Sequence, residues 1–402
     1  MTKLFVVVGL VCSSALATGQ GLVPMRAENF VFAPGAVEFV GAKGMATGSG
    51  AKATGGGSAA GAAAGSGPAG QAGAGGQAGT EGAAMKIVDG SGLVRLKGVD
   101  FSDGTIEFDI LPEEKQFSSM YFRWQDSAES ECFYFRTDRM GQPQAIQYTP
   151  IIGGINCWNL FDDYQTAAEW QPKMAIHTKL VVSGKRLRVY LNHGTTPALD
   201  VPRLEGNVTH GSICFEGKCT LSNLIVAPGR VDGLSPAEGP DAAVNDPHYI
   251  RHWQVTKPKP IPAGVDFSAA LMPDSQQVWQ PIDVERRGMV NLTRAFPPEK
   301  DFIRRIIFLR TTLHADQERT CHLQLGFMNE IWVWLNGQWL YLDKNLYGTP
   351  IAKQRGRISI DNGAVSVPLR QGDNELLVAI GGGFYGWGLM ARIGELEGIT
   401  MK

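Results

Sequence analysis

Two acidic residues on one alternating segment are the first candidates for chemistry in this chain of 402 residues. Along residues 104–110 every second side chain is apolar, so a strand there would place Glu107 and Asp109 together on its other face. Residues two apart on a strand are separated by about 7 Å, within the roughly 6.5–9.5 Å between the carboxyls of inverting glycosidases. The spacing therefore allows glycoside hydrolysis by Glu107 and Asp109.

Residues 120–125 and 133–136 are two further alternating segments, and they extend this polar face if their strands lie beside residues 104–110. Alternation places Arg123 and Gln125 on one side of the first segment, and Tyr134 and Arg136 on one side of the second. A surface that mixes carboxylates, guanidinium groups and an aromatic ring suits a ligand rich in hydroxyl groups. The alternative is a solvated outer face on which arginines pair with carboxylates.

A third group of candidates surrounds Asn336-Gly337, a dipeptide that strongly favours a two-residue type I′ turn. Because cross-strand partners share a face, we expect one face of the hairpin to belong to the core and to consist of Ile331, Val333, Leu335, Leu340 and Leu342. The other face collects Trp332, Trp334, Trp339 and Tyr341. Exposed, it would be a platform on which sugar rings stack. Covered, it would be a second packing layer or a seam between domains, and the size of the apolar patch favours burial.

A glycine-rich run at residues 381–388 contains Phe384, Tyr385 and Trp387. It could add to a site at the edge of a sheet, or its glycines could serve only to permit tight turns.

Cysteines and histidines give little support for a metal site. Cys214 and Cys219 flank a predicted hairpin turn and could form a disulfide, whereas the odd number of cysteines beyond Cys12 leaves at least one thiol free. His248 and His252 are four residues apart but lie beside a proline in an extended stretch, so we interpret them as surface or packing residues. The calcium-loop pattern is absent, so we expect no cofactor, although Ca²⁺ occurs in such sandwiches.

The first 17 residues have the pattern of an export signal. A basic start is followed by an apolar run at residues 4–11, too short to span a bilayer, and by Ala15-Leu16-Ala17, which fits the cleavage rule. A lipid-modified Cys12 is the weaker alternative. We expect a secreted, periplasmic or extracellular protein with no membrane insertion. The net charge of −2 gives no electrostatic reason for a nucleic-acid partner.

The elements that must position these residues are predicted to be strands. Short alternating segments recur along the chain and no long helical period appears, which predicts an all-β protein with two β-sandwich or jelly-roll domains in tandem. We place the first domain at 18–229, a linker rich in Gly, Pro and acids at 230–248, and the second domain at 249–402. Residues 42–84 form a Gly/Ala-rich tract, predicted to be a disordered insertion between strands of one sheet.

The first domain resembles a known group of sandwiches. Residues 101–109, Phe122-Arg123, 133–136, 147–150 and Trp158 are similar to concanavalin-like, laminin-G-like sandwiches of the 3-keto-disaccharide hydrolase and family 16 glycoside hydrolase groups. The resemblance implies a curved sandwich whose concave face receives sugars, and it adds Tyr148 and Trp158 to the candidate sugar contacts. Family 16 enzymes carry a third acid on the first of these strands, where this chain has Leu111 and Pro112, so family 16 catalysis is not expected.

The second domain resembles a different group of modules. Residues 325–327, 331–337 and 369–376 are similar to galactose-binding-like jelly rolls that accompany family 2 glycoside hydrolases. Such a module is accessory, so no catalytic residue follows from it. The function we expect is carbohydrate binding, with a glycan or polysaccharide as the partner. The alternatives are a glycan-processing hydrolase and a structural or adhesive envelope protein that binds other proteins.

Overall fold

The regular secondary structure of the described residues consists almost entirely of strands, which confirms the predicted all-β class. The computed structural model describes residues 21–41, 83–88, 92–113, 117–241, 243–262, 265–297 and 304–402. The predicted export signal with Cys12, and residues 42–82 of the predicted insertion, lie outside these ranges. Within them the α-helical residues are those of α1 (Leu292–Ala295). Short 3-10 turns occur at η1 (Ala27–Asn29), η3 (Thr137–Arg139), η4 (Asp162–Tyr164), η5 (Ala269–Leu271), η6 (Arg286–Gly288) and η7 (Lys353–Arg355).

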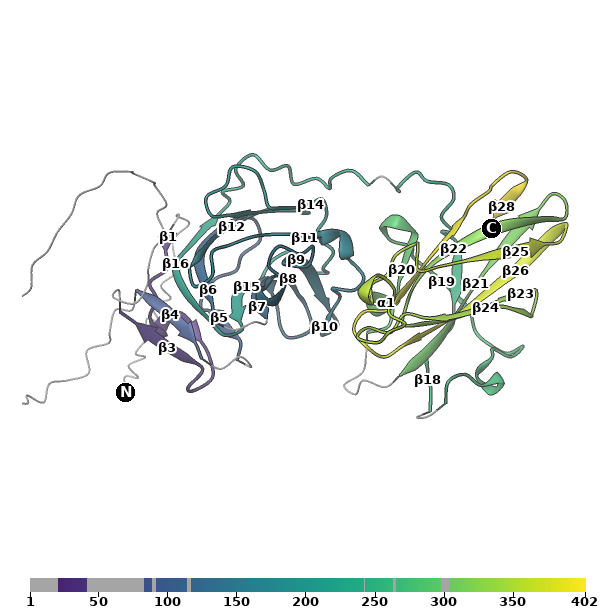
Figure 1. Cartoon of the computed structure of the whole chain (residues 1–402), viewed down its shortest axis with the longest axis horizontal. Helices are drawn as coiled ribbons and strands as arrows, with labels where there is room; N and C mark the ends of the chain where they lie inside the picture. Colours follow the sequence, from purple (N-terminus) through teal and green to yellow (C-terminus); the bar gives the residue numbers. More distant parts are fainter. Residues whose placement is uncertain are drawn as a thin grey trace, which may run out of the picture.

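The first sandwich stacks two antiparallel sheets (Figure 1). The β6 sheet runs in the order β14 (Leu199–Val201), β13 (Arg186–Leu191), β12 (Ile176–Ser183), β6 (Gly104–Pro112), β16 (Cys219–Pro228), β4 (Ala84–Ile87) and β3 (Val37–Val40), with β1 (Gly21–Leu22) also on β16. The β8 sheet runs in the order β10 (Ile155–Asn156), β9 (Ile146–Ile152), β8 (Ser130–Arg136), β7 (Phe117–Trp124), β15 (Ser212–Glu216), β5 (Val94–Leu96) and β2 (Phe30–Val31), with β11 (Gln165–Thr166) on β9. Strands β3 and β4, on either side of the predicted insertion, pair directly.

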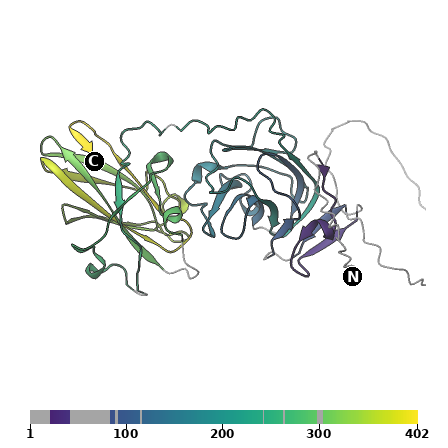
Figure 2. The same ribbon diagram turned by 180° about the vertical axis from the view of Figure 1, so that it is seen from behind.

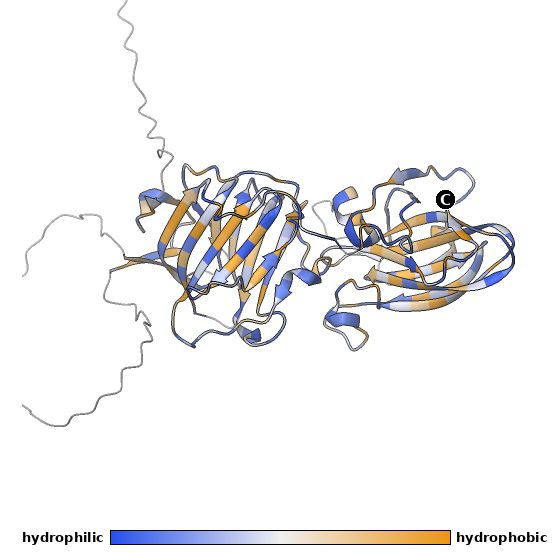
Figure 3. Ribbon diagram, turned by 90° about the horizontal axis from the view of Figure 1, so that it is seen from above, coloured by the Kyte–Doolittle hydropathy of each residue, from blue (hydrophilic) through white to orange (hydrophobic). Residues whose placement is uncertain are grey.

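Alternation along these strands builds the first core. Figure 3 shows hydrophilic and hydrophobic residues following one another along the strands. The apolar series of β6 faces inward, and so do one phenylalanine of β7 and two of β8, all of which are buried: Ile106, Phe108, Ile110, Phe122, Phe133 and Phe135. Because side chains alternate between the two faces of a strand, the polar series of the same strands must face outward.

The second sandwich also has two antiparallel sheets. The β26 sheet runs in the order β19 (Gln280–Ile282), β17 (Trp253–Val255), β21 (Arg305–Ala315), β26 (Gly372–Gly382), β23 (Glu330–Leu335) and β24 (Gln338–Lys344), with β18 (Lys259–Pro260) and β28 (Ile399–Met401) on β21. The β22 sheet runs in the order β20 (Met289–Asn291), β27 (Gly388–Ile393), β22 (Arg319–Met328) and β25 (Gly363–Leu369). No helix in the described ranges is long and apolar enough to cross a membrane.

The β23–β24 hairpin confirms the predicted turn but not the whole predicted register. Asn336 and Gly337 both have positive φ, and Trp334 pairs with Trp339 as expected. An irregularity then pairs Val333 with Tyr341. As a result Tyr341 packs against the second core, and Leu342 is 42% exposed. The predicted faces of Tyr341 and Leu342 were wrong, because simple alternation does not anticipate a β-bulge.

The two sandwiches share a packed seam. Figures 1 and 2 show them end to end, with the segment that connects them running along one side. The hydrophobic core of the first sandwich continues into Met289, Met328, Ile358 and Met390, all of which belong to the second. Across the seam, Asn159 donates a hydrogen bond to the Gly386 carbonyl at 2.7 Å and accepts one from the Gly386 amide at 3.1 Å. These apolar and polar contacts hold residues of both sandwiches close together.

Candidate functional site

Glu107 and Asp109 do not share a face with the other predicted polar residues. Both lie on β6, which pairs with β12 and β16. Arg123 lies on β7 and Gln125 directly follows it, while Tyr134 and Arg136 lie on β8, and both of these strands belong to the opposite sheet. The chain crosses from one sheet to the other between β6 and β7. The prediction of one polar face with all six residues was therefore wrong, because strands consecutive in sequence need not be neighbours in a sandwich.

The two acids belong instead to a charge-paired outer face. His177 Nδ1 lies 2.8 Å from Asp109 Oδ1, and Asn223 donates to Asp109 Oδ2 at 2.6 Å. Partial burial by itself would raise the pKa of Asp109, but the hydrogen bonds with His177 and Asn223 outweigh it and the pKa is lowered. Glu107 lies 3.7 Å from Arg230 and 3.9 Å from His177. This arrangement matches the alternative of a face held together by ion pairs.

Arg123 has a structural position. Its side chain is 3% exposed. The guanidinium group donates hydrogen bonds to the Ser102 carbonyl, to Asp103 Oδ1 and to the Gly184 carbonyl, each at 2.9 Å. All of these acceptors belong to the protein, so the predicted sugar contact is wrong for Arg123. Gln125 is exposed and donates to the His210 carbonyl.

The two tyrosine candidates of the first sandwich are both buried, on opposite faces of the β8 sheet. Tyr148 is fully buried in the core, where its hydroxyl donates to Glu131 Oε2 at 2.6 Å and accepts from the Glu205 amide at 2.6 Å. The predicted sugar contact is therefore wrong for Tyr148. Tyr134, on the opposite face of the sheet, is 2% exposed and donates to Gln147. Arg136 is half-buried, with its guanidinium 4.9 Å from the centre of the Phe117 ring.

The hairpin tryptophans are also largely covered. Trp332 and Trp334 are buried in a separate cluster with residues of the 261–279 segment, and the Phe267 ring lies 5.3 and 5.4 Å from their ring centres. The structure thus has the predicted second packing layer in place of an open platform. Only Trp339 of the predicted tryptophan face is more than half exposed, at 52%.

The aromatic surface that is open lies where the two sandwiches meet. We call Trp158, Tyr347, Phe384 and Tyr385 the junction aromatic cluster. Trp158 meets Tyr347 and Tyr385 edge-on at ring distances of 5.0 and 5.4 Å, and Tyr347 stacks on Phe384 at 5.8 Å. Tyr347, Phe384 and Tyr385 are 42%, 43% and 39% exposed, whereas Trp158 is almost buried beneath them. The cluster presents three ring surfaces to solvent.

Glycines allow the loop that carries Phe384 and Tyr385 to approach the first sandwich. A Cβ on Gly386 would lie 2.8 Å from Leu160 Cγ, and a Cβ on Gly382 would lie 2.3 Å from the Trp387 ring. A larger residue could not fit at either position without displacing these neighbours. Tyr347 is held in a similar way, because Gly356, with φ of 75°, packs against it. The glycine-rich run therefore positions aromatic side chains as well as allowing a turn.

A pocket of about 340 Å³ adjoins the junction aromatic cluster. Its lining residues are Arg304, Asn329, Glu330, Leu346, Tyr347, Gly382, Gly383 and Phe384. The Glu330 carboxylate lies 2.6 Å from Arg304 and 3.2 Å from Lys344. The pocket therefore combines two aromatic rings with an amide, a carboxylate and a guanidinium group.

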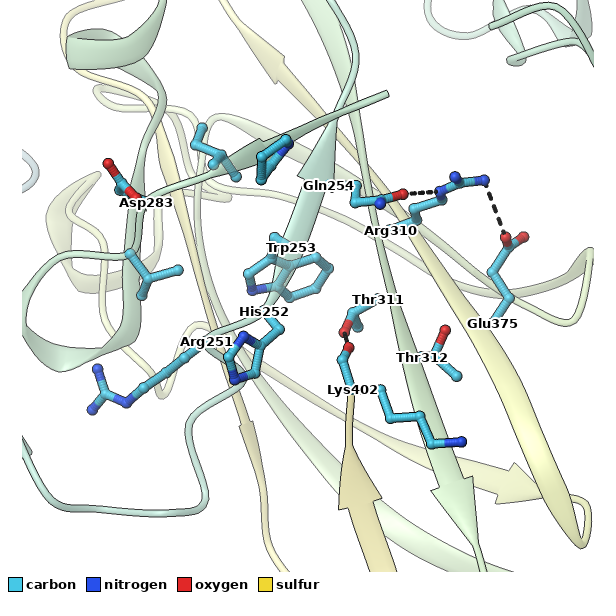
Figure 4. A pocket seen from close by; sticks show the side chains of 13 residues that line it. Arg251, His252, Trp253, Gln254, Asp283, Arg310, Thr311, Thr312, Glu375 and Lys402 are labelled. Atoms are coloured by element: carbon cyan, nitrogen blue, oxygen red, sulfur yellow. Dashed lines mark hydrogen bonds and ion pairs between the residues drawn. The ribbon is translucent and has the colours of Figure 1, made fainter. Parts of the chain in front are cut away.

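A larger pocket, of about 770 Å³, lies on the second sandwich (Figure 4). Most of its lining residues are polar or charged: Arg310 donates to Gln254 at 2.9 Å and lies 3.9 Å from Glu375. Its tryptophan, Trp253, is 3% exposed. Another pocket of about 560 Å³ lies between the sandwiches and shares Pro281, Ile282 and Asp283 with it. Neither combines the open ring faces and polar groups found at the junction, and none of the three pockets is lined by Glu107 or Asp109.

The predicted Cys214–Cys219 disulfide was wrong. Both thiols are free and buried, as are Cys132, Cys157 and Cys321. Cys214 lies on β15 of the β8 sheet and Cys219 on β16 of the β6 sheet, so the intervening turn joins two sheets and not two paired strands. In the part of the chain that the structure describes, no group of three or more His, Cys, Asp or Glu side chains is arranged to hold a metal ion.

Sequence reasoning missed most of the junction. Tyr347, Asn329, Glu330 and Arg304 come from separate loops and strand ends, and no motif connects them. The available signal was the aromatic pair Phe384-Tyr385 within a run of glycines, because large rings in a loop without apolar neighbours need a partner surface or a ligand.

Comparisons with known proteins give only weak structural similarities and no family. No family model and no curated protein matches the chain. Among solved structures, the carbohydrate binding module CBM66 from Bacillus subtilis is 14% identical with a TM-score of 0.28, over 35% of this chain and 84% of that one. The Caenorhabditis elegans galectin LEC-6 is 18% identical with a TM-score of 0.24, over 32% and 89%.

A further similarity spans both sandwiches. An anti-sigma factor domain-containing protein from Clostridium clariflavum is 10% identical with a TM-score of 0.27, over 78% of this chain and 83% of that one. At these identities and TM-scores the three similarities say nothing about a ligand. We therefore base the function on the geometry of the site.

Proposed function

We propose that this protein binds carbohydrate at the junction of its two sandwiches. The observation that carries the proposal is the junction aromatic cluster, in which Tyr347, Phe384 and Tyr385 are each at least 39% exposed beside a pocket of about 340 Å³. Small-molecule sites combine aromatic walls with a few fixed polar groups. The apolar faces of sugar rings pack on aromatic side chains, and their hydroxyls exchange hydrogen bonds with planar polar groups.

The polar groups of the pocket suit this ligand. The Asn329 amide offers both donors and acceptors and the Glu330 carboxylate accepts, whereas the Arg304 guanidinium already donates to Glu330 and to the Val265 and Asp266 carbonyls. Arg304 and Lys344 hold the Glu330 carboxylate from two sides, so its orientation is set before a ligand arrives. A prearranged site loses less conformational entropy on binding. We further propose that the chain is exported, on the basis of the signal pattern in its first 17 residues, which is consistent with an extracellular glycan as the ligand.

The test is a glycan-array screen of residues 18–402, followed by calorimetric titration of the best glycan. Replacing Phe384 by Ala removes a ring surface from the cluster, and we expect the affinity to fall at least tenfold. Trp339→Ala is the matched control, because Trp339 is a comparably exposed ring that contacts Phe267 and Trp334 and not the cluster. Equal losses in the two variants, or no binding to any glycan by folded protein, would contradict the proposal and favour the structural or adhesive alternative.

A further inference from the structure

A guanidinium group with two unpaired nitrogens is buried against the junction aromatic cluster. Arg357 is 3% exposed, and its Nε and Nη2 atoms have no hydrogen-bond partner. Its Cζ atom lies 4.8 Å from the centre of the Trp158 ring, which is the ring that Tyr347 and Tyr385 contact from their edges. The unpartnered group therefore lies against the junction aromatic cluster.

The loop that carries Arg357 is tightly held. The Asn345 side chain donates to the Arg357 carbonyl at 2.9 Å, and Asn362 donates to the same carbonyl at 3.2 Å. The preceding residue, Gly356, packs so closely on Tyr347 that a Cβ there would be 2.6 Å from the Tyr347 Cβ. The backbone of Arg357 is thus fixed relative to the cluster.

The charges near Arg357 do not neutralise it. Burial lowers the pKa of Arg357, the Arg136 charge adds to this effect, and Tyr134, Asp162 and Tyr347 oppose it. Asp162 lies 3.6 Å from Arg287, its ion-pair partner, and Arg136 lies 3.7 Å from Asp138. The Arg136 Nε is also buried without a hydrogen-bond partner. Arg136 lies two residues from Tyr134 on β8, and burial raises the pKa of Tyr134 while the charges of Arg357 and Arg136 oppose that rise.

We propose that the glycan bound at the junction carries an anionic group, either a carboxylate or a sulfate ester, that binds to Arg357 with Arg136 beside it. This inference rests on the proposed function, since it names the chemical class of the same ligand. A carboxylate or sulfate accepts two parallel hydrogen bonds from one guanidinium group, which would satisfy the Nε and Nη2 donors that the protein leaves unpaired. A neutral hydroxyl could satisfy a donor but would leave the buried charge uncompensated.

The proposal requires that the anionic group reach Arg357 through rotation of side chains at the junction. Tyr347 and Tyr385, the rings that meet Trp158 beside Arg357, are both more than one third exposed. Exposed side chains change rotamer within picoseconds to nanoseconds, so the sandwiches need not separate.

The experiment compares charged and neutral forms of the same glycan. Residues 18–402 are titrated with polygalacturonate and its methyl ester, and with a sulfated galactan and its desulfated form, at 50 and 300 mM NaCl. We expect the protein to bind at least one charged form tenfold or more tightly than its neutral counterpart, with the preference weakened by salt. Arg357→Gln should abolish the preference and Arg357→Lys should retain part of it. Arg310→Gln is the matched control. The Arg310 Cζ atom lies 4.4 Å from the centre of a tryptophan ring, that of Trp279, but Arg310 lines the pocket of Figure 4 and not the junction.

The outcomes separate this inference from the proposed function. If charged and neutral forms bind equally and Phe384→Ala weakens both, the anionic group is refuted and carbohydrate binding stands. If folded protein binds none of these glycans and none on the array, both proposals fail. If circular dichroism shows that Arg357→Gln does not fold, Arg136→Gln decides: a reduced preference for the charged form supports the inference, and an unchanged preference that is also insensitive to salt overturns it.

Discussion

At the scale of single residues, the chemistry of this protein depends on what surrounds each polar group. Asp109 was singled out by its type and spacing, and it lies in a network with His177 and Asn223 that keeps it ionised. No sequence pattern distinguishes Glu131 from other glutamates, yet its side chain is fully buried and one of its carboxylate oxygens has no hydrogen-bond partner. Arg357 is likewise buried, and its cationic group has two nitrogens without hydrogen-bond partners. Burial, which the residue type does not reveal, distinguishes these groups.

The buried Glu131 predicts a dependence of stability on pH. Burial raises the pKa of Glu131 from 4.5 to about 7, so the folded state holds the proton more tightly than the unfolded chain. Its contribution to stability is therefore complete below about pH 4.5 and is lost as the pH rises through about 7. At pH 8.5 the charged form would cost about 3 kcal/mol.

We expect Glu131→Gln to raise the melting temperature at pH 8.5 and to change it little at pH 5, as measured by calorimetry at both values. Glu375→Gln, an exposed glutamate on β26, is the control and should show no such difference. A Glu131→Gln variant that is destabilised equally at the two pH values would contradict the assignment.

At the scale of elements, an aromatic face serves packing where another segment covers it and can bind a ligand where it is left open. The β23–β24 hairpin presents Trp332 and Trp334 on one face, and the 261–279 segment covers them through Phe267, Leu271 and Met272. The segment turns a potential binding platform into a packing layer. The glycine-rich loop between β26 and β27 has the opposite effect, since it leaves Phe384 and Tyr385 in solvent. Aromatic residues of similar size thus serve packing in one place and surface in the other.

Removing the cover should expose the hairpin tryptophans. Phe267→Ala deletes the ring that contacts both Trp332 and Trp334, and we expect a loss of about 2 kcal/mol in stability, below the usual cost for a fully buried phenylalanine. Acrylamide quenching of tryptophan fluorescence should increase, while glycan affinity should stay unchanged because the rings that Phe267 contacts, Trp332, Trp334 and Trp339, lie outside the junction aromatic cluster. Unchanged quenching would show that other residues of the segment provide the cover.

At the scale of the whole molecule, the proposed site exists only because two sandwiches meet. Trp158 comes from the first, and Tyr347, Phe384 and Tyr385 come from the second. Asn159 joins them through its two hydrogen bonds with Gly386, and the Ile358 amide donates to the Asn159 carbonyl at 2.9 Å. The function we propose is therefore a property of the pair of sandwiches.

A change at the seam should weaken binding without touching a ligand contact. In Gly386→Ala the new methyl group would lie 2.8 Å from Leu160 Cγ and 2.9 Å from Leu160 Cδ1, so the loop or the seam must move. We expect at least a tenfold loss of glycan affinity, together with faster proteolytic cleavage in residues 229–248. Gly394→Ala is the control, because the added Cβ would meet its nearest neighbour, His322 Cβ, at 3.5 Å, an ordinary van der Waals distance. Full affinity in Gly386→Ala would mean that the cluster does not depend on the seam.

The sequence by itself determined the class of the fold and several local details. Alternation of apolar and polar residues is a local property with a period of two, so it predicted the strands and the inward series of β6, β7 and β8. The Asn336-Gly337 turn was equally readable, because both positions require positive φ. Burial of the hairpin tryptophans followed from the cost of exposing so much apolar surface.

Only the tertiary structure decided which strands are neighbours and which residues form a site. Strand pairing depends on contacts between distant segments, so Glu107 and Arg123 were assigned to one face although they lie in opposite sheets. For the same reason Cys214 and Cys219 seemed able to bridge a hairpin that does not exist. The junction combines Trp158 with residues some 190 to 230 positions later in the chain. No local pattern encodes that meeting, because it results from the packing of two separately built sandwiches.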